Sequence, residues 1–212
     1  MKLYTYPDAP SPRRVQLFLA EKGLDIPRQT IDLRAGEHLR PEFAAINPAL
    51  TVPALVLDDG TCLVEPIAIC DYLEQVHPEP ALFGRSPLER AMVLERNHWI
   101  ETNGLLAVME GFRNRSKAMS DRALTGPRRV SQIPELAERG VQRYGWFLED
   151  LDRRLADSDY VAGDRFSLAD ITAWVTLEFA AWGIRTNLPE TLTSLQRWHR
   201  QLASRPAFAR RD

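Results

Sequence analysis

The chain has 212 residues, of which 44% are hydrophobic and 26% charged, and this is enough apolar material for one large or two small globular domains. The composition excludes a disordered chain, and a formal net charge of −2 favours neither nucleic acid nor an anionic membrane as a partner. No apolar stretch reaches the ~18 residues of a membrane helix. The chain also runs from Met1 directly into a strand pattern without a signal peptide. Cys62 and Cys70 lie in apolar runs and agree with a reducing compartment, so we expect a cytoplasmic protein.

The first elements in chain order are a strand, a helix and a second strand. Residues 2–6 form an apolar, alternating run that the proline-rich loop 7–12 ends. An amphipathic helix begins at Arg13 and stops at Gly23, and residues 26–33 are a second strand. A strand, helix and strand in this order predict a βαβ unit with parallel strands and a right-handed crossover.

A hairpin and a helix follow. A short helix at residues 41–46 precedes two apolar runs, 54–57 and 61–64, which flank the turn signal Asp58-Asp59-Gly60. The apolar period then changes from that of a strand to that of a helix over residues 65–77. The first part of the chain is therefore predicted as α/β, in the order βαβ and then ββα.

Pro53 stands at the first residue of the third predicted strand. A proline inside a sheet removes one ladder hydrogen bond, so its position indicates an edge strand. The Val52-Pro53 bond is either an ordinary trans bond that starts the strand or a cis bond. In the cis case we expect Val52 to offer its backbone N–H and C=O to a ligand.

Strand signals disappear after residue 87, and the rest of the chain is predicted as an all-α helical bundle. Ser167, with Asp170 three residues later, is a capping-box start of the third of its helices. The predicted helices cover residues 88–117, 133–156, 168–183 and 192–204. Prolines at 78 and 80 indicate a stiff connector. The predicted organisation is a first domain at 1–78, a linker at 79–86 and a helical domain at 87–212.

Four motifs in this order resemble the cytosolic glutathione transferase family. They are Tyr-x-x-x-x-Ser-Pro-Arg-Arg-Val from Tyr6, Gly-Glu-His-Leu-Arg-Pro-Glu-Phe from Gly36, Asn-Pro-x-x-x-Val-Pro-Ala-Leu from Asn47, and Ala-Gly-Asp-Arg-Phe-Ser-Leu-Ala-Asp from Ala162. The resemblance covers the whole chain. It implies a thioredoxin-like, glutathione-binding first domain, a helical substrate-side domain, and a homodimer.

The resemblance also implies a group that stabilises the thiolate of glutathione at the start of the first helix. Ala9 occupies the usual Ser, Cys or Thr position, which excludes a mixed-disulfide mechanism there. Ser11 falls on a position that is Asn in some members and is the first candidate for the thiol donor, although it also suits a turn or an N-cap. Tyr6, as in the tyrosine-type members, and the backbone amides of the helix start are the alternatives.

Five further positions match glutathione-binding residues of the family. Val52 and Pro53 correspond to the cis pair that docks the cysteinyl backbone, and Glu65 to an acid that takes the γ-glutamyl ammonium. Pro66 replaces a serine that grips the γ-glutamyl carboxylate, which leaves the N–H of Ile67 and the helix dipole for this role. Without a ligand, Glu65 is simply an acid favoured at a helix start.

His38 is the remaining candidate binding residue, because it matches a residue that approaches the glycyl carboxylate in several classes of the family. The alternative interpretation is an ordinary surface histidine. The sequence holds no pattern of metal ligands, so no metal is expected.

The leading hypothesis is a detoxifying glutathione transferase that conjugates the thiol of glutathione, its co-substrate, to a small hydrophobic electrophile. Two alternatives remain open. Ala9 and Pro66 favour a non-catalytic binding or regulatory member of the fold, whereas Ser11 in place of Asn favours a glutathione-dependent disulfide reductase or peroxidase.

Overall fold

The computed structural model describes residues 1–209, which fall into two compact units. The first unit consists of Met1–Pro80 together with Thr125–Arg128. The second consists, within the described residues, of Ala81–Leu124 and residues 129–209. The first unit is α/β and the second is helical, as the sequence predicts.

The first unit is built on a mixed sheet with the strand order β2-β1-β3-β4. β1 (Lys2–Thr5) pairs in parallel with β2 (Arg28–Thr30), as the predicted βαβ unit requires. β3 (Ala54–Val56) is antiparallel both to β1 and to β4 (Cys62–Leu63), so the predicted hairpin is confirmed. The second strand is shorter than predicted, since the chain pairs with β1 only between Pro27 and Ile31.

The prediction that Pro53 marks an edge strand is wrong. β3 lies between β1 and β4 in the interior of the sheet, and Pro53 precedes its first residue. A proline just outside the ladder removes no ladder hydrogen bond, and this is why an inner strand tolerates it. The Val52-Pro53 peptide bond is cis.

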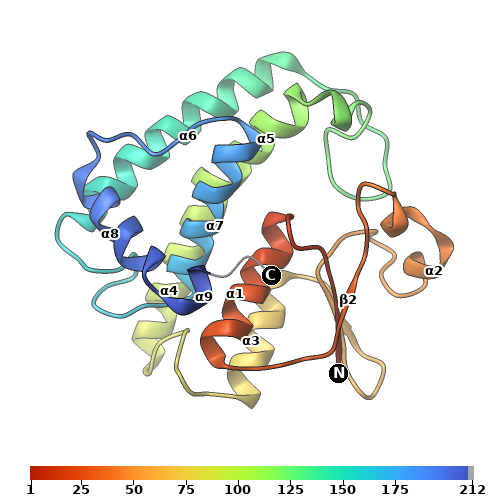
Figure 1. The fold of residues 1–212 in the computed structure, drawn as a ribbon, viewed down its shortest axis with the longest axis horizontal. Helices are drawn as coiled ribbons and strands as arrows, with labels where there is room; N and C mark the ends of the chain where they lie inside the picture. Colours follow the sequence, from red (N-terminus) through yellow and green to blue (C-terminus); the bar gives the residue numbers. More distant parts are fainter. Residues whose placement is uncertain (210–212) are drawn as a thin grey trace. The chain divides into compact units, whose positions relative to one another are not determined.

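Two long helices lie side by side in the first unit, α1 (Pro10–Lys22) and α3 (Pro66–Val76) (Figure 1). α1 begins three residues earlier than predicted, because proline is accepted at the first position of a helix. It ends as predicted at Gly23, which adopts the left-handed conformation with φ 65°. The unit also contains a 3₁₀ turn at Glu37–Leu39 and the short α2 (Pro41–Ala44).

α1, α3 and the sheet enclose the core of the first unit. A buried ion pair crosses between the two helices: Lys22 Nζ lies 2.5 Å from a carboxylate oxygen of Glu74. The same ammonium group donates hydrogen bonds to the carbonyl groups of His77 and Pro80, both at 2.7 Å. The fully buried apolar side chains of this core are Leu3, Val15, Phe18, Leu19, Leu55, Ile69 and Leu73.

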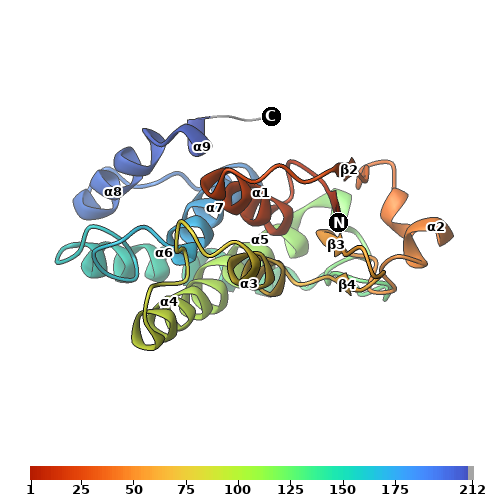
Figure 2. The same ribbon diagram turned by 90° about the horizontal axis from the view of Figure 1, so that it is seen from below.

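The second unit is helical throughout, and α7 (Leu168–Gly183) is buried along most of its length and packs against α4 and α5 (Figure 2). The predicted long helical stretch is α4 (Pro87–Ile100) and α5 (Leu106–Arg115), joined by a π-helical turn at Glu101–Leu105. The other helices are α6 (Pro134–Leu155), α8 (Thr193–Ala203) and α9 (Pro206–Ala209), besides a 3₁₀ turn at Lys117–Met119. α9 was not predicted. Within residues 1–209, no helix combines the length and the apolar character that a membrane span requires.

Candidate functional site

The sheet register brings several chain segments to one end of the first unit. Thr5 of β1 lies opposite Thr30 of β2, and these parallel strands end at the same side. β3 runs the other way, with Ala54 opposite Tyr4, so it begins at that side, and β4, antiparallel to β3, ends there. The start of α1, the segment after β2, the Val52-Pro53 bond and the start of α3 therefore all emerge from this end of the sheet.

The first turn of α1 offers hydrogen-bond donors at one residue. Ala9 is the N-cap, with φ −86° and ψ 137°, and its side chain provides no cap. Pro10 and Pro12 have no N–H, and the N–H of Arg13 is already bonded to the carbonyl of Ala9 at 3.0 Å. Ser11 is half-buried, and its N–H makes no hydrogen bond to another described residue. Ser11 therefore presents both a backbone N–H and a hydroxyl at the positive end of the helix dipole.

Arg14 contacts the hydroxyl group of Ser11 and makes its oxygen a hydrogen-bond acceptor. Nη2 of Arg14 donates to Oγ of Ser11 at 3.4 Å, and the Arg14 side chain is itself buried. A guanidinium group has only donors, so the Ser11 oxygen is the acceptor in this contact. The hydroxyl hydrogen is then left for a second partner. The sequence analysis did not single out Arg14, although its i+3 spacing from Ser11 places the two on one helix face.

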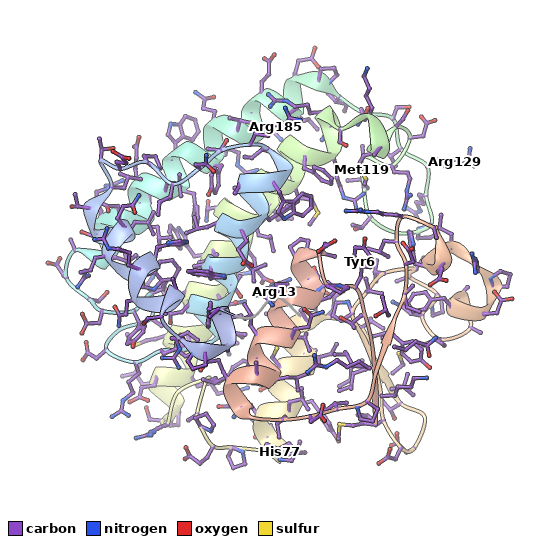
Figure 3. The ribbon with its side chains drawn as sticks, viewed as in Figure 1. Tyr6, Arg13, His77, Met119, Arg129 and Arg185 are labelled. Carbon is purple, nitrogen blue, oxygen red and sulfur yellow. The ribbon has the colours of Figure 1, made fainter. Side chains whose placement is uncertain are left out.

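Tyr6 lies just beyond β1 (Figure 3) and has a packing role. Its ring contacts the buried cluster formed by Ile31, Phe43 and Val52. Its carbonyl accepts a hydrogen bond from the N–H of Ala9 at 3.3 Å, which closes the turn before α1. Tyr6 is therefore half-buried, packed against this cluster and hydrogen-bonded to Ala9. This arrangement favours a structural role over that of a thiol donor.

The turn before the cis bond is held by Asn47, which is only 1% exposed. Its Nδ2 donates to the carbonyl of Thr51 at 2.8 Å, and its Oδ1 accepts from the N–H of Ala49 at 2.9 Å. Leu50 in this turn adopts the left-handed conformation with φ 55°. Neither the N–H nor the C=O of Val52 bonds to another residue of the described chain, so both remain available to a ligand. The Asn-Pro signal before the hairpin indicated a turn, but not this buried amide.

The start of α3 matches the predicted arrangement. Glu65 is the exposed N-cap, with φ −99° and ψ 129°, and its carboxylate makes no capping hydrogen bond to the helix. Pro66 is buried at the first helical position. Because Pro66 lacks an N–H, the donors of the first turn begin with Ile67. Glu65, Pro66 and Ile67 are thus brought to the same end of the sheet as Ser11 and Val52.

His38 is 6% exposed, so the interpretation of this residue as an ordinary surface histidine is wrong. It lies in the 3₁₀ turn Glu37–Leu39, which follows β2. Its segment leaves the same end of the sheet as the other candidates, but most of the ring is covered by protein. Gly36 allows the turn with φ 72°, and Leu39 is the side chain that faces solvent.

The cysteines add no nucleophile to this site. Cys70 in α3 is completely buried, and burial raises the pKa of its thiol far above the usual value. Burial also raises the pKa of Cys62. Both thiols are free and remain protonated near neutral pH. Among residues 1–209, no group of three His, Cys, Asp or Glu side chains is arranged to hold a metal ion.

Comparisons with known proteins agree with this architecture. Residues 9–76 match the family described as glutathione S-transferase, N-terminal domain, and residues 134–201 match glutathione S-transferase, C-terminal domain. Glutathione S-transferase 2 of Saccharomyces cerevisiae is 34% identical over 212 residues, which cover 98% of this chain and 87% of that protein. Maleylacetoacetate isomerase of Pseudomonas aeruginosa is 46% identical over 93 residues, 43% of this chain and 44% of that protein.

Solved structures extend the likeness to three dimensions. The structure of a glutathione S-transferase domain-containing protein from Marinobacter aquaeolei has a TM-score of 0.90 and 35% identity, and the match covers 98% of this chain and 100% of that chain. The first family match lies in the βαβ-ββα unit, and the second lies in the helical second unit. The chain therefore belongs to the glutathione S-transferase family.

Proposed function

We propose that this protein is a glutathione-dependent transferase that conjugates the thiol of glutathione to a small hydrophobic electrophile. The observation that carries the proposal is the first turn of α1, where Ser11 supplies a free N–H and a hydroxyl between two prolines. The proposal is supported by the strand register, because the start of α1, Val52 and the start of α3 emerge from the same end of the sheet. Conjugation then proceeds by orienting the thiolate and stabilising its charge, without a covalent enzyme intermediate.

The energy required is within reach of these groups. A free cysteine thiol has a pKa near ~8.5, and lowering it by ~2 units requires roughly 2.7 kcal/mol of preferential stabilisation of the thiolate. A hydrogen bond to a charged group contributes about 1.5–3 kcal/mol. A helix N-terminus adds about 0.3–1 kcal/mol. The hydroxyl of Ser11 and its N–H together are therefore sufficient, and no side chain at Ala9 is needed.

The rest of the tripeptide has a proposed partner at each end. The N–H and C=O of Val52, before cis Pro53, pair with the cysteinyl backbone of glutathione. The carboxylate of Glu65, which makes no capping hydrogen bond to α3, takes the γ-glutamyl ammonium group. Since Pro66 has no N–H, the N–H of Ile67 and the dipole of α3 hold the γ-glutamyl carboxylate. His38 is proposed for the glycyl carboxylate, and 6% of the residue is exposed.

The variant Ser11→Ala tests the proposal. We expect kcat/KM for conjugation of glutathione to an aryl halide to fall at least tenfold, because a hydrogen bond to the thiolate contributes more than ~1.4 kcal/mol. Tyr6→Phe is the matched control. It removes the other candidate hydroxyl and keeps the ring that packs on Phe43. If Ser11→Ala loses less than threefold while Tyr6→Phe loses more than tenfold, the tyrosine is the thiol donor and the assignment of Ser11 fails.

The main alternative is a binding or regulatory protein without turnover, which the methyl side chain of Ala9 and the missing N–H of Pro66 favour. Retention on immobilised glutathione without turnover of aryl halides, disulfides or peroxides would establish it. Turnover of disulfides or peroxides alone would instead favour a reductase or peroxidase. The similarity to a maleylacetoacetate isomerase over 93 residues adds the isomerisation of maleylacetoacetate to the reactions worth assaying.

We also propose that the protein is a cytoplasmic homodimer. The support is the family to which the chain belongs and the exposed apolar side chains of α4, among them Leu88 at 70% and Met92 at 37% exposure. Light scattering behind a sizing column tests the oligomeric state. A mass near the 24.1 kDa of one chain at micromolar concentration would contradict the dimer.

A further inference from the structure

The contact between Arg14 and Ser11 carries an inference about how the thiol donor is held. Arg14 lies one turn after Ser11 on α1, and its side chain is 3% exposed. Nη2 of Arg14 reaches Oγ of Ser11 at 3.4 Å. Ser11 itself is half-buried, so its hydroxyl contacts a buried cation while part of the residue is still exposed.

We propose that Arg14 is a positioning residue, whose guanidinium group holds the Ser11 oxygen as an acceptor and so directs the hydroxyl hydrogen to the thiol of glutathione. The inference rests on the proposed function, because it requires Ser11 to be the thiol donor. Arg14 does not touch the substrate. It acts only through the serine.

The physical basis is the limited set of directions open to a serine hydroxyl. A hydroxyl group has one hydrogen and two acceptor lone pairs, and the hydrogen rotates to suit its neighbours. A donor such as a guanidinium group occupies a lone pair and repels the hydrogen, which must then point elsewhere. Without Arg14, the hydroxyl is free to rotate and to donate to water or to a nearby carbonyl. The fraction of time in which it donates to a thiolate then falls.

The charge of Arg14 also acts on the neighbouring helix α3. Burial is the main cause that raises the pKa of the neighbouring Cys70 thiol, and the positive charge of Arg14 opposes it, while Glu74 and Asp71 act in the same direction as burial. Arg14 therefore acts electrostatically across the gap between α1 and α3. Glu74 is paired with Lys22 at 2.5 Å. A charged donor polarises the hydroxyl group and makes it a stronger donor to the thiolate.

A double-mutant cycle on kcat/KM for aryl halide conjugation tests the inference. The enzymes compared are the wild type, Arg14→Gln, Ser11→Ala and the double variant. We expect each single variant to lose at least fivefold, and the double variant to be no slower than Ser11→Ala within twofold, because Arg14 has no route to the thiol without the hydroxyl. Arg28→Gln is the matched control, since Arg28 is exposed on β2.

Two results would overturn the inference in different ways. If Ser11→Ala is slow while Arg14→Gln is within twofold of the wild type, or if their losses multiply in the double variant, Arg14 does not act through Ser11 and the proposed function stands. If Ser11→Ala itself is as fast as the wild type, the proposed thiol donor fails and the inference fails with it.

The pH dependence of kcat/KM for the aryl halide, measured at saturating glutathione, separates positioning from a general loss of folding. A purely structural role lowers the plateau of the profile and leaves its acidic limb in place. The positioning role predicts that the limb moves to higher pH by at least half a unit in Arg14→Gln, by a similar amount in Ser11→Ala, and by less in Arg14→Lys, which keeps the charge. Should Arg14→Gln melt below the assay temperature, Arg14→Lys decides: an unmoved limb and an unchanged rate would contradict the inference.

Discussion

Asp170 gives the sharpest prediction about stability, since a fully buried carboxylate gathers four donors at the start of α7. Its Oδ1 accepts from the N–H of Val161 and from Nε1 of Trp198, both at 2.9 Å. Its Oδ2 accepts from the N–H of Ser167 at 2.9 Å and from the Ser167 hydroxyl at 3.1 Å. The predicted capping box is thus present, and it extends to a loop and to α8.

Two opposing effects decide the cost of the substitution Asp170→Ala. Burial raises the pKa of Asp170 from 3.8 to about 6, although the four hydrogen bonds oppose the rise. At pH 7 the ionised group therefore costs about 3 kcal/mol relative to the same group in water. Each of the four donors left buried without a partner costs about 1–3 kcal/mol. The loss of the four hydrogen bonds outweighs the gain from removing the buried charge. We therefore expect Asp170→Ala to lower the free energy of unfolding by about 3 kcal/mol or more at pH 7.

The dependence on pH has a definite sign. Because the pKa of Asp170 is higher in the folded state than in the unfolded state, folding takes up a proton between pH 3.8 and about 6. The contribution of Asp170 to stability is therefore largest at acid pH and falls as the pH rises through the folded pKa. Urea unfolding of the wild type and of Asp170→Ala should show a difference in unfolding free energy that is larger by about 1 kcal/mol at pH 5 than at pH 7. A difference that shrinks towards acid pH would refute the dominance of burial, and a loss below 1 kcal/mol at pH 7 would refute the hydrogen-bond argument.

Substitutions at Gly140, Leu50 and Lys22, with two control variants, test the packing and the backbone. In Gly140→Ala the new Cβ would lie 2.6 Å from the carbonyl oxygen of Ala107 and 2.7 Å from the N–H nitrogen of Gly111, so we expect a loss above ~2 kcal/mol in urea unfolding. Gly145→Ala in the same helix meets nothing within 4 Å and should gain up to about 1 kcal/mol; equal effects at the two sites would contradict the close approach of α5 and α6. Leu50 has φ 55°, so Leu50→Gly should raise the melting temperature by relieving about 1 kcal/mol of backbone strain, whereas Leu50→Ala should not. A lower melting temperature for the glycine variant would show that the packing of the leucine side chain matters more than the backbone strain. Lys22→Met removes the ammonium group that pairs with the buried Glu74 and should cost about 3–5 kcal/mol; a loss under 1 kcal/mol would mean that this ion pair contributes little to stability.

The sequence predicts the fold where local chemistry and the tertiary structure agree. The turn at Asp58-Asp59-Gly60 and the end of α1 at Gly23 each follow from a residue type with one preferred geometry. The change of apolar period separates the strand at residues 54–57 from the helix at residues 65–77. The prediction fails where the position of a segment depends on pairing with residues that are far away in the sequence. Pro53 carries no signal that β1, from the start of the chain, pairs with β3 on the side opposite β4 and so makes β3 an inner strand.

The candidate site shows the same division. The donors of Ser11 follow from the Pro-Ser-Pro sequence, since two prolines remove the competing N–H groups. The partner of the Ser11 hydroxyl depends on the rotamer of Arg14, and the burial of His38 depends on how its turn packs after β2. Neither is encoded in a pattern of single residues. The left-handed conformation of Leu50 was also not predicted, because leucine seldom adopts it and the turn imposes it.

The central claim is that the end of the sheet around Ser11 binds glutathione and makes its thiol acidic, and the titration of the bound thiol tests it most directly. The ultraviolet absorbance of the thiolate, followed against pH with saturating protein, gives the pKa of the bound glutathione. We predict a value about two units below the ~8.5 of a free cysteine thiol, and a smaller decrease in Ser11→Ala. A bound thiol that titrates within half a unit of the free one, or no binding at millimolar glutathione, would contradict the claim.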